Sequence, residues 1–490
     1  MSRIPPLVPI KHRLLPGPKQ WIKGIFALLS LFVLGCTPER DAAGWYEHAR
    51  TLIAASNNPQ KPDAPALRTL PIAQRAEAIR SLQQALAKDS TLVEATLLLA
   101  RLHTSDGRYE TAAQHYRQLI ETQPDLAAAY EGLGLSLAAQ GRYSAAMRAY
   151  QDALRRGALS AQLYTRLGHV YQALGHVPAH LRSAEASYQA ALQLAPDQAD
   201  IHLHLGRVQE RLDKRQAART QYRQAYDLAP RDIGIRLSLA TFLRSQNLLP
   251  QARQLLLDGL QEDPDSGILH LELGRLLWES GETAQALPHF QAALAADSTL
   301  APAYRYLGLS LSSQGQLDQA LKIFQRLETL HPFDPVAKIS SGIIHTQQGD
   351  LERAEAQFKA ALELAADDGD AALKLGGLYI HQERYQVAIR TFKKGLEAHP
   401  EHAELHASLG DAYRRLGMLG TALQACRQAV ELEPERALWH FHLASTLERL
   451  DAEQARLAWR QYLQLAAADD GEKVRMAQAR QHLQDLDQAP

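Results

Sequence analysis

The chain has 490 residues, a formal net charge of −1 and two cysteines, Cys36 and Cys426. A chain of this length exceeds one typical domain, so a single hydrophobic core is not expected. The near-zero net charge argues against a nucleic-acid binder. Two cysteines cannot form a disulfide framework or a CxxC zinc site. The abundance of Ala, Leu, Gln and Arg, which favour helices, predicts an all-α protein.

The first 35 residues have the pattern of an export signal. Five basic residues precede position 24, and the first acidic residue is Glu39. The run "GIFALLSLFVLG" over 24–35 is uncharged and mostly apolar. This arrangement is typical of a secretory signal peptide. The run is also shorter than the roughly 20 apolar residues that a transmembrane helix needs.

The sequence "VLGC" at 33–36 resembles the lipobox of bacterial lipoprotein signal peptides. This resemblance implies that residues 1–35 are removed and that Cys36 carries lipid, which anchors the chain in a membrane. Each buried CH₂ of an acyl chain contributes about 0.8 kcal/mol to such anchoring. Thr37 after the cysteine implies, by enteric-type sorting, the outer membrane facing the periplasm. The alternatives are an uncleaved membrane anchor and a cysteine placed there by chance.

Residues 36–90 are expected to form a degenerate repeat with a proline-rich loop. The stretch "WYEHARTLIAA" at 45–55 predicts a first helix. Pro59, Pro62, Pro65 and Pro71 follow it and predict a loop. A second helix is expected over about 73–88.

Residues 91–468 consist of one unit repeated at a spacing of 34, with a single step of 38. A small residue marks each unit: Ala100, Gly134, Gly168, Gly206, Ala240, Gly274, Gly308, Gly342, Gly376, Gly410 and Ala444. Alanine follows twelve residues later, and Ala184 takes this place after an insertion of four residues. An aromatic residue usually comes four residues after that alanine, and Cys426 replaces it in one unit. Many units end with proline, which stops a helix.

This period and pattern resemble the tetratricopeptide repeat (TPR). The resemblance implies an α-solenoid, a right-handed superhelix of about twelve helix-turn-helix units. The small residues and the alanines would let paired helices approach closely, and the aromatic residues would fill the space between neighbouring repeats. Cys426 is interpreted as a buried apolar residue. Residues 469–490 are expected to be a C-terminal capping helix and tail, with Met476, Leu483 and Leu486 on its apolar face.

In TPR proteins the first helix of each unit lines a concave groove. Relative to the small residue, the lining positions are −6, −3, −2, +1, +4 and +5. This rule selects the candidate protein-binding residues Arg166, Arg207, Arg211, Arg244, Arg275, Trp278, Arg305, Tyr306, Arg414 and Arg415. Arginine and aromatic residues dominate binding hot spots. The alternatives are that Trp278 only covers the neighbouring repeat and that the arginines form a solvated helix face.

The sequence contains no motif that indicates catalysis, and no cofactor is expected. HExxH, the Walker P-loop and GxSxG are all missing from it. The densest histidine cluster, His399, His402 and His406, spans a turn between repeats, so solvated surface is favoured over a metal site. The chain is therefore predicted not to be an enzyme, and to have neither catalytic nor metal-binding residues.

The expected function is a membrane-anchored scaffold that binds protein partners in a bacterial envelope complex. By analogy of size, exopolysaccharide export fits best, ahead of pilus or outer-membrane protein assembly. Two alternatives stay open: a non-catalytic accessory subunit of a glycosyltransferase, and a polysaccharide-binding repeat protein.

Overall fold

The structure is a computed structural model that describes residues 40–54, 67, 70–175, 177–365, 367–467 and 470–488. Within these ranges all regular secondary structure is helical, and the all-α solenoid is confirmed. Cys36, the preceding apolar run and most of the proline-rich segment lie outside the described residues. The contacts divide the chain into two compact units, residues 1–235 and 236–490, and each unit is considered separately.

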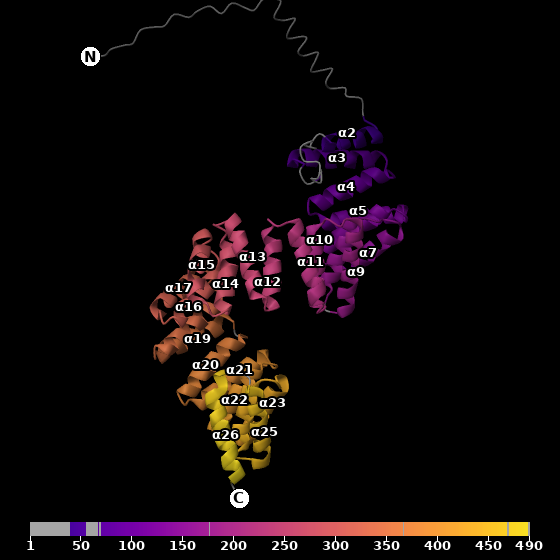
Figure 1. The fold of residues 1–490 in the computed structure, drawn as a ribbon. Helices are drawn as coiled ribbons and strands as arrows, with labels where there is room; N and C mark the ends of the chain where they lie inside the picture. The colour runs from indigo at the N-terminus through magenta and orange to yellow at the C-terminus, as the bar shows by residue number, and fades with distance from the viewer. Residues whose placement is uncertain are drawn as a thin grey trace, which may run out of the picture. The chain divides into compact units, whose positions relative to one another are not determined.

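In the first unit the helices stack side by side in chain order (Figure 1). They are α2 (Ala42–Ala54), α3 (Ile72–Lys88), α4 (Val93–Ser105), α5 (Tyr109–Thr122), α6 (Ala127–Ala139), α7 (Tyr143–Arg155), α8 (Ala161–Ala173), α9 (Pro178–Leu194), α10 (Ala199–Arg211) and α11 (Arg215–Leu228). Helix α12 (Ile233–Ser245) contains the boundary between the units.

The second unit continues the same pattern. Its further helices are α13 (Leu249–Glu262), α14 (Gly267–Glu279), α15 (Thr283–Ala296), α16 (Ala301–Ser313), α17 (Leu317–Leu330), α18 (Pro335–Gln347), α19 (Leu351–Leu364), α20 (Gly369–His381), α21 (Tyr385–Ala398), α22 (Ala403–Arg415), α23 (Leu419–Leu432), α24 (Ala437–Leu447), α25 (Ala452–Ala466), the 3₁₀ turn η1 (Asp470–Glu472) and α26 (Lys473–Gln488).

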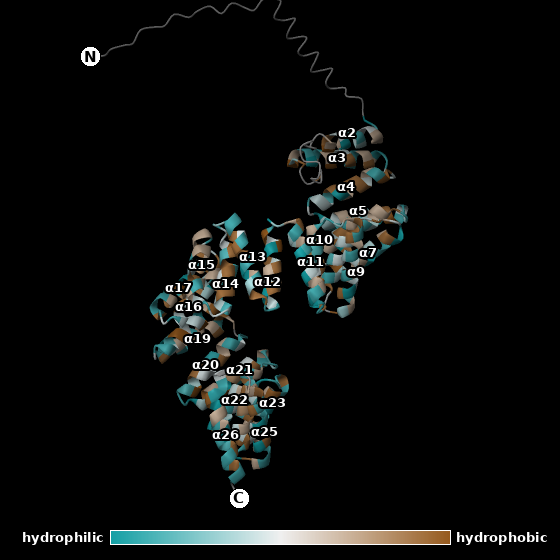
Figure 2. Ribbon diagram, viewed as in Figure 1, coloured by the Kyte–Doolittle hydropathy of each residue, from teal (hydrophilic) through white to brown (hydrophobic). Residues whose placement is uncertain are grey.

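The helices α2 to α25 form twelve successive pairs, in agreement with the expected number of repeats. Hydrophobic and hydrophilic residues occur together on these helices (Figure 2), as amphipathic packing requires. The even-numbered helix of each pair is called the first helix below, and the odd-numbered one the second helix. Each first helix except α12 has its main contacts with its own second helix.

A tight turn joins the two helices of most pairs, and its key residue lies seven positions after the small residue. In six repeats this residue is a glycine with φ between 72° and 80° or, for Gly417, 83°. In three others it is Asp213, Asn247 or Glu383, with φ of 56–61°. Only a left-handed residue ends the first helix and reverses the chain so quickly, which explains the preference for glycine here.

The small residues allow the aromatic residues of the second helices to pack on the backbone of the first. A Cβ atom at Gly134 would lie 2.5 Å from the Tyr150 ring, and one at Gly376 only 2.2 Å from the Phe392 ring. Rings also reach the next repeat, because Phe290 stacks on Tyr306 at 5.6 Å. The predicted roles of both residue types are thus confirmed at these positions.

Cys426 occupies the aromatic position of α23, and it is 1% exposed. A Cβ at Gly410 would lie 2.6 Å from its Sγ atom. Burial raises the pKa of the Cys426 thiol to about 11. The interpretation of this residue as a buried apolar side chain is confirmed.

The irregular repeats differ from the others at their helix ends. The pair α2–α3 fits the repeat if Ala49 is its small residue, and Ala78 then lies 29 residues later instead of twelve. The extra residues therefore fall between the two helices. The insertion before Ala184 extends α9 to 17 residues, because Pro178 starts it early. At the C-terminus, Met476, Leu483 and Leu486 of α26 pack on the cluster around Trp459, as expected for a cap.

Candidate protein-binding face

The surface formed by the first helices is called the A-helix face here. Successive first helices such as α4 and α6 in the first unit, or α20 and α22 in the second, pack against each other. Among the described residues, successive second helices make no contact of that extent. Because the first helices lie closer together, the A-helix face is the inner side of the curvature within each unit.

Most of the predicted groove arginines are engaged within the chain. In the first unit, Arg166 of α8 pairs with Glu131 of α6 at 2.6 Å. Arg211 of α10 donates to the Gly175 carbonyl at 2.7 Å, beyond the end of α8. Arg207 is exposed on the same helix. These bonds connect neighbouring repeats, so Arg166 and Arg211 have a structural role.

In the second unit, Arg244 of α12 donates from Nη1 to both carboxylate oxygens of Glu279 on α14, each at 2.7 Å. Arg275 pairs with Glu272 one turn earlier on α14. Burial raises the pKa of the Glu272 carboxyl, although the Arg275 and Arg244 guanidinium groups act against this shift. Arg244, Glu272, Arg275 and Glu279 thus form a balanced, partly desolvated charge cluster.

Further along the A-helix face, Arg305 of α16 lies 3.6 Å from Asp334, the residue that caps α18. Arg414 and Arg415 both bind Asp411 on their own helix. Burial favours the neutral form of Asp411, but the hydrogen bonds and charges of Arg415 and Arg414 outweigh it and lower the pKa of this carboxyl. These pairs reduce the net positive charge that the sequence suggested for the face.

Trp278 of α14 and Tyr306 of α16 form a half-buried aromatic pair on the A-helix face. Their rings meet edge to face with centroids 5.4 Å apart. The inner face of Tyr306 lies on Phe290. Trp439 and Trp459 donate their indole N–H groups to Glu433 and Glu448. In contrast, the Trp278 N–H and the Tyr306 hydroxyl have no partner within the described part of the chain. We call Trp278 and Tyr306 the aromatic pair.

The clustered histidines act locally in the turns. His406 donates from Nε2 to the Pro400 carbonyl at 2.8 Å, His399 bonds to the Asp367 carbonyl, and the Leu405 amide donates to His402 Nδ1. His202, His270 and His440 each repeat the His406 bond with the proline six residues earlier. In the described ranges, no three His, Cys, Asp or Glu side chains are grouped to hold a metal ion.

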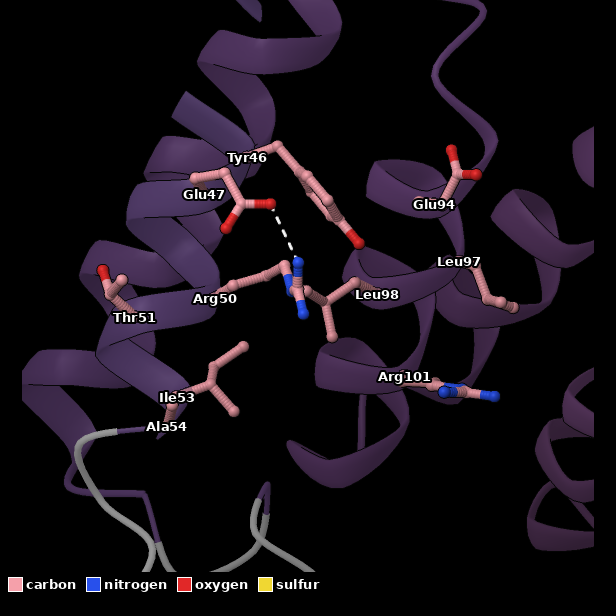
Figure 3. Close-up of a pocket in the computed structure, with 10 residues that line it drawn as sticks. All are labelled: Tyr46, Glu47, Arg50, Thr51, Ile53, Ala54, Glu94, Leu97, Leu98 and Arg101. Atoms are coloured by element: carbon pink, nitrogen blue, oxygen red, sulfur yellow. Dashed lines mark hydrogen bonds and ion pairs between the residues drawn. The ribbon is translucent and has the colours of Figure 1, made fainter. Parts of the chain in front are cut away.

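The search by lining position missed the face of the first pair. A pocket of about 450 Å³ lies between α2 and α4 (Figure 3). Tyr46, Arg50 and Ile53 line it from α2, and Leu97, Leu98 and Arg101 from α4. Taking Ala49 and Ala100 as the small residues, these are all lining positions of the repeat. Applying the rule to the degenerate first pair would have found them.

Within the described residues, no helix has the length and apolar character needed to cross a membrane.

Family models named "Tetratricopeptide repeat" match most of the chain. One model matches residues 73–127, 97–161, 131–179, 165–233 and 271–335, a second matches 345–412, and a third matches 403–436. A search of curated proteins found no significant match.

Solved structures with similar folds include three helical-repeat proteins. Yeast Tom70 is 14% identical, with a TM-score of 0.49, covering 91% of this chain and 95% of its own. Cut9, from the APC/C Cut9–Hcn1 hetero-tetramer, is 16% identical, with a TM-score of 0.40, covering 83% and 93%. MamA from Desulfovibrio magneticus RS-1 is 25% identical, with a TM-score of 0.31, covering 35% and 97%.

Proposed function

Because the chain belongs to the tetratricopeptide repeat proteins, which are protein-binding scaffolds, we propose that it is a membrane-anchored scaffold of a bacterial envelope complex. Its partner is a protein segment that binds the A-helix face. The matching families are repeats alone, and none of them is an enzyme family. In this proposal the chain holds other proteins in place and performs no chemistry of its own.

The aromatic pair is the observation that carries the partner-binding part. Trp278 and Tyr306 are half-buried, and their N–H and O–H groups have no partner among the described residues, whereas both tryptophans near the C-terminus are satisfied. Aromatic residues with an apolar body and a free polar atom are typical of binding hot spots. The adjacent charge cluster of Arg244, Glu272, Arg275 and Glu279 supplies a polar rim.

The membrane anchor rests on the sequence before the first described residue. The "VLGC" motif at 33–36 supports cleavage before Cys36 and its acylation. Thr37 supports delivery to the outer membrane, facing the periplasm. Exopolysaccharide export is the complex that the length of the repeat array favours, ahead of pilus or outer-membrane protein assembly.

The anchor is tested by expressing the full chain and Cys36→Ala in a Gram-negative host with a fatty-acid analogue. We expect label and membrane fractionation for the wild type only. Labelling of neither form, with residues 1–35 retained, would contradict the anchor.

The partner is tested with a photo-crosslinking amino acid at position 278, followed by pull-down from envelopes. An envelope protein is expected in the crosslinked product. A crosslinker at Arg390, an exposed residue of the second helix α21, is the control. Equal recovery from both positions, or no envelope protein, would argue against the proposal.

Polysaccharide binding is a second candidate, and the aromatic pair is again the feature that favours it, since sugar rings stack on exposed aromatic faces. Phe441 does not add to this platform, because it packs on Trp459 and Tyr462. Binding on a glycan array that disappears in Trp278→Ala would support this function, and an array without signal would remove it. An accessory role beside a glycosyltransferase would instead appear as that enzyme in the crosslinked product.

A further inference from the structure

A second pocket lies on the opposite side of the first unit, between second helices. Its volume is about 410 Å³, and it is bounded by α5 and α7, with α6 beneath. Ile120, Leu133 and Leu137 give it an apolar floor. Arg117 and Arg148 stand at its edges, together with Arg142, which precedes α7. This α5–α7 pocket shares no residue with the A-helix-face positions selected from the sequence.

A comparison of the repeats shows why this space is open. In three other repeats the residue after the second-helix alanine pairs with a residue 29 positions later, just before the next second helix. These pairs are Glu185–Lys214 at 2.7 Å, Arg253–Glu282 at 3.0 Å and Glu355–Arg384 at 2.8 Å. At the α5–α7 interface the equivalent residues are Ala113 and Arg142. Alanine cannot reach across, so the pairing is lost and a pocket remains.

The arginines around the pocket lack close partners as a result. Arg142 Nη1 is 4.0 Å from Glu110, and Arg117 Nη1 is 3.8 Å from the same carboxylate. Both distances exceed that of a hydrogen bond. Arg148 is exposed and makes no ion pair with any described residue.

The carboxylates of the pocket do not cancel this charge. Asp152 is already bound by Arg155 and Arg156. Glu121 is the other acidic lining residue, and it is exposed. Three guanidinium groups therefore face an apolar slot with an excess of positive charge.

We propose that the α5–α7 pocket is a second protein-docking site, which binds a partner segment with aliphatic side chains flanked by carboxylates. The aliphatic groups would cover Ile120, Leu133 and Leu137, and the carboxylates would take the place of the missing acidic partner of Arg142. The volume lies in the range of sites that hold a few side chains. The inference goes beyond the A-helix face, since a chain with sites on both faces holds two partners at once.

The test measures fluorescence anisotropy of a labelled peptide, Gly-Glu-Leu-Leu-Glu-Gly, with the full chain in detergent. Two comparison peptides replace the leucines by serine or the glutamates by lysine. We expect the Glu–Leu peptide to bind at least tenfold more tightly than either. Arg142→Glu combined with Arg148→Glu should weaken its binding at least tenfold, because both residues are exposed and their exchange leaves the fold intact. Ala145→Leu, which fills the pocket without changing charge, should do the same.

Arg390→Glu is the matched control, because Arg390 is exposed two residues after the alanine of α21, as Arg148 is on α7. It should change the affinity less than twofold. Equal binding of the serine peptide, equal loss in Arg390→Glu, or no binding of the Glu–Leu peptide would overturn the proposal. Trp278→Ala should leave this peptide's affinity unchanged, so failure here is separate from failure of the A-helix face.

Discussion

The ring of Phe392 on α21 lies directly against the backbone of Gly376 on α20, and a Cβ at Gly376 would be 2.2 Å from it. Gly377, the next residue of the same helix, has nothing within 4 Å of its Cβ position. Two adjacent glycines in one helix thus differ in a single respect, the presence of a buried ring. This pair isolates the packing role of the repeat's small residue.

Gly376→Ala should lower the free energy of unfolding by about 1–3 kcal/mol, because the buried Phe392 ring must move to admit the methyl group. Gly377→Ala should be neutral or stabilising by up to about 1 kcal/mol, since alanine favours a helix. Urea denaturation of both variants measures the difference. Equal effects of the two substitutions would show that the ring adapts freely.

Glu383→Gly should stabilise the second unit by roughly 0.5–1 kcal/mol. Glu383 has a φ of 61°, where a side chain costs about 1–2 kcal/mol, and the extra entropy of unfolded glycine offsets part of the gain. Gly349→Ala, at the same turn position with φ of 78°, should be destabilising by a similar amount. Thermal unfolding of both variants checks the opposite signs, and a stabilising Gly349→Ala would refute the argument.

The first unit should lose stability as pH falls from about 6.5 towards 4. Burial, with the charges of His169 and Arg207, lowers the pKa of His204 to about 4. The unfolded chain therefore binds more protons over this range, so acid favours unfolding, and the stability is complete only above pH 6.5. His169, whose own pKa is lowered mainly by burial while Asp200 opposes the shift, adds to this trend.

His204→Phe tests this dependence. The urea midpoint of the variant should change less between pH 7.5 and 5 than that of the wild type. His204 stacks on Tyr188 with centroids 5.8 Å apart, so a phenyl ring fits the same place. His381→Gln, at an exposed position, should keep the wild-type pH dependence. An unchanged slope in His204→Phe would refute this assignment.

Cys426 should resist thiol reagents in the folded chain at pH 8. Its side chain is 1% exposed and its pKa of about 11 leaves little thiolate. Complete reaction is expected in denaturant. Labelling in mass spectrometry measures both rates, and rapid modification under native conditions would contradict the packing of α23.

Trp278→Ala should reduce recovery of the A-helix-face partner at least tenfold, because a half-buried aromatic anchor is lost. Trp278→Phe keeps a ring but removes the N–H, so it separates stacking from hydrogen bonding. Melting temperatures of both variants serve as the control for folding. Undiminished recovery with Trp278→Ala would mean that Trp278 only covers the neighbouring repeat.

The sequence by itself determined the repeat, its helices and the packing of Gly376, Ala388 and Cys426, because a period of 34 places the same small, alanine and aromatic positions in contact in every unit. It could not determine which groove arginines are available. Arg166 meets Glu131 and Arg244 meets Glu279 across neighbouring repeats, at separations of 35 residues that no local pattern indicates.

Only the tertiary structure revealed the α5–α7 pocket and the α2–α4 pocket. Each depends on how far apart two helices lie, and therefore on what one side chain finds opposite it in the next repeat. Ala113 looks ordinary in the sequence. Its effect appears only when Arg142 is seen to lack the partner that Lys214, Glu282 and Arg384 have at the same position. Repeat position is encoded locally, whereas vacancy at a position is a property of two packed units.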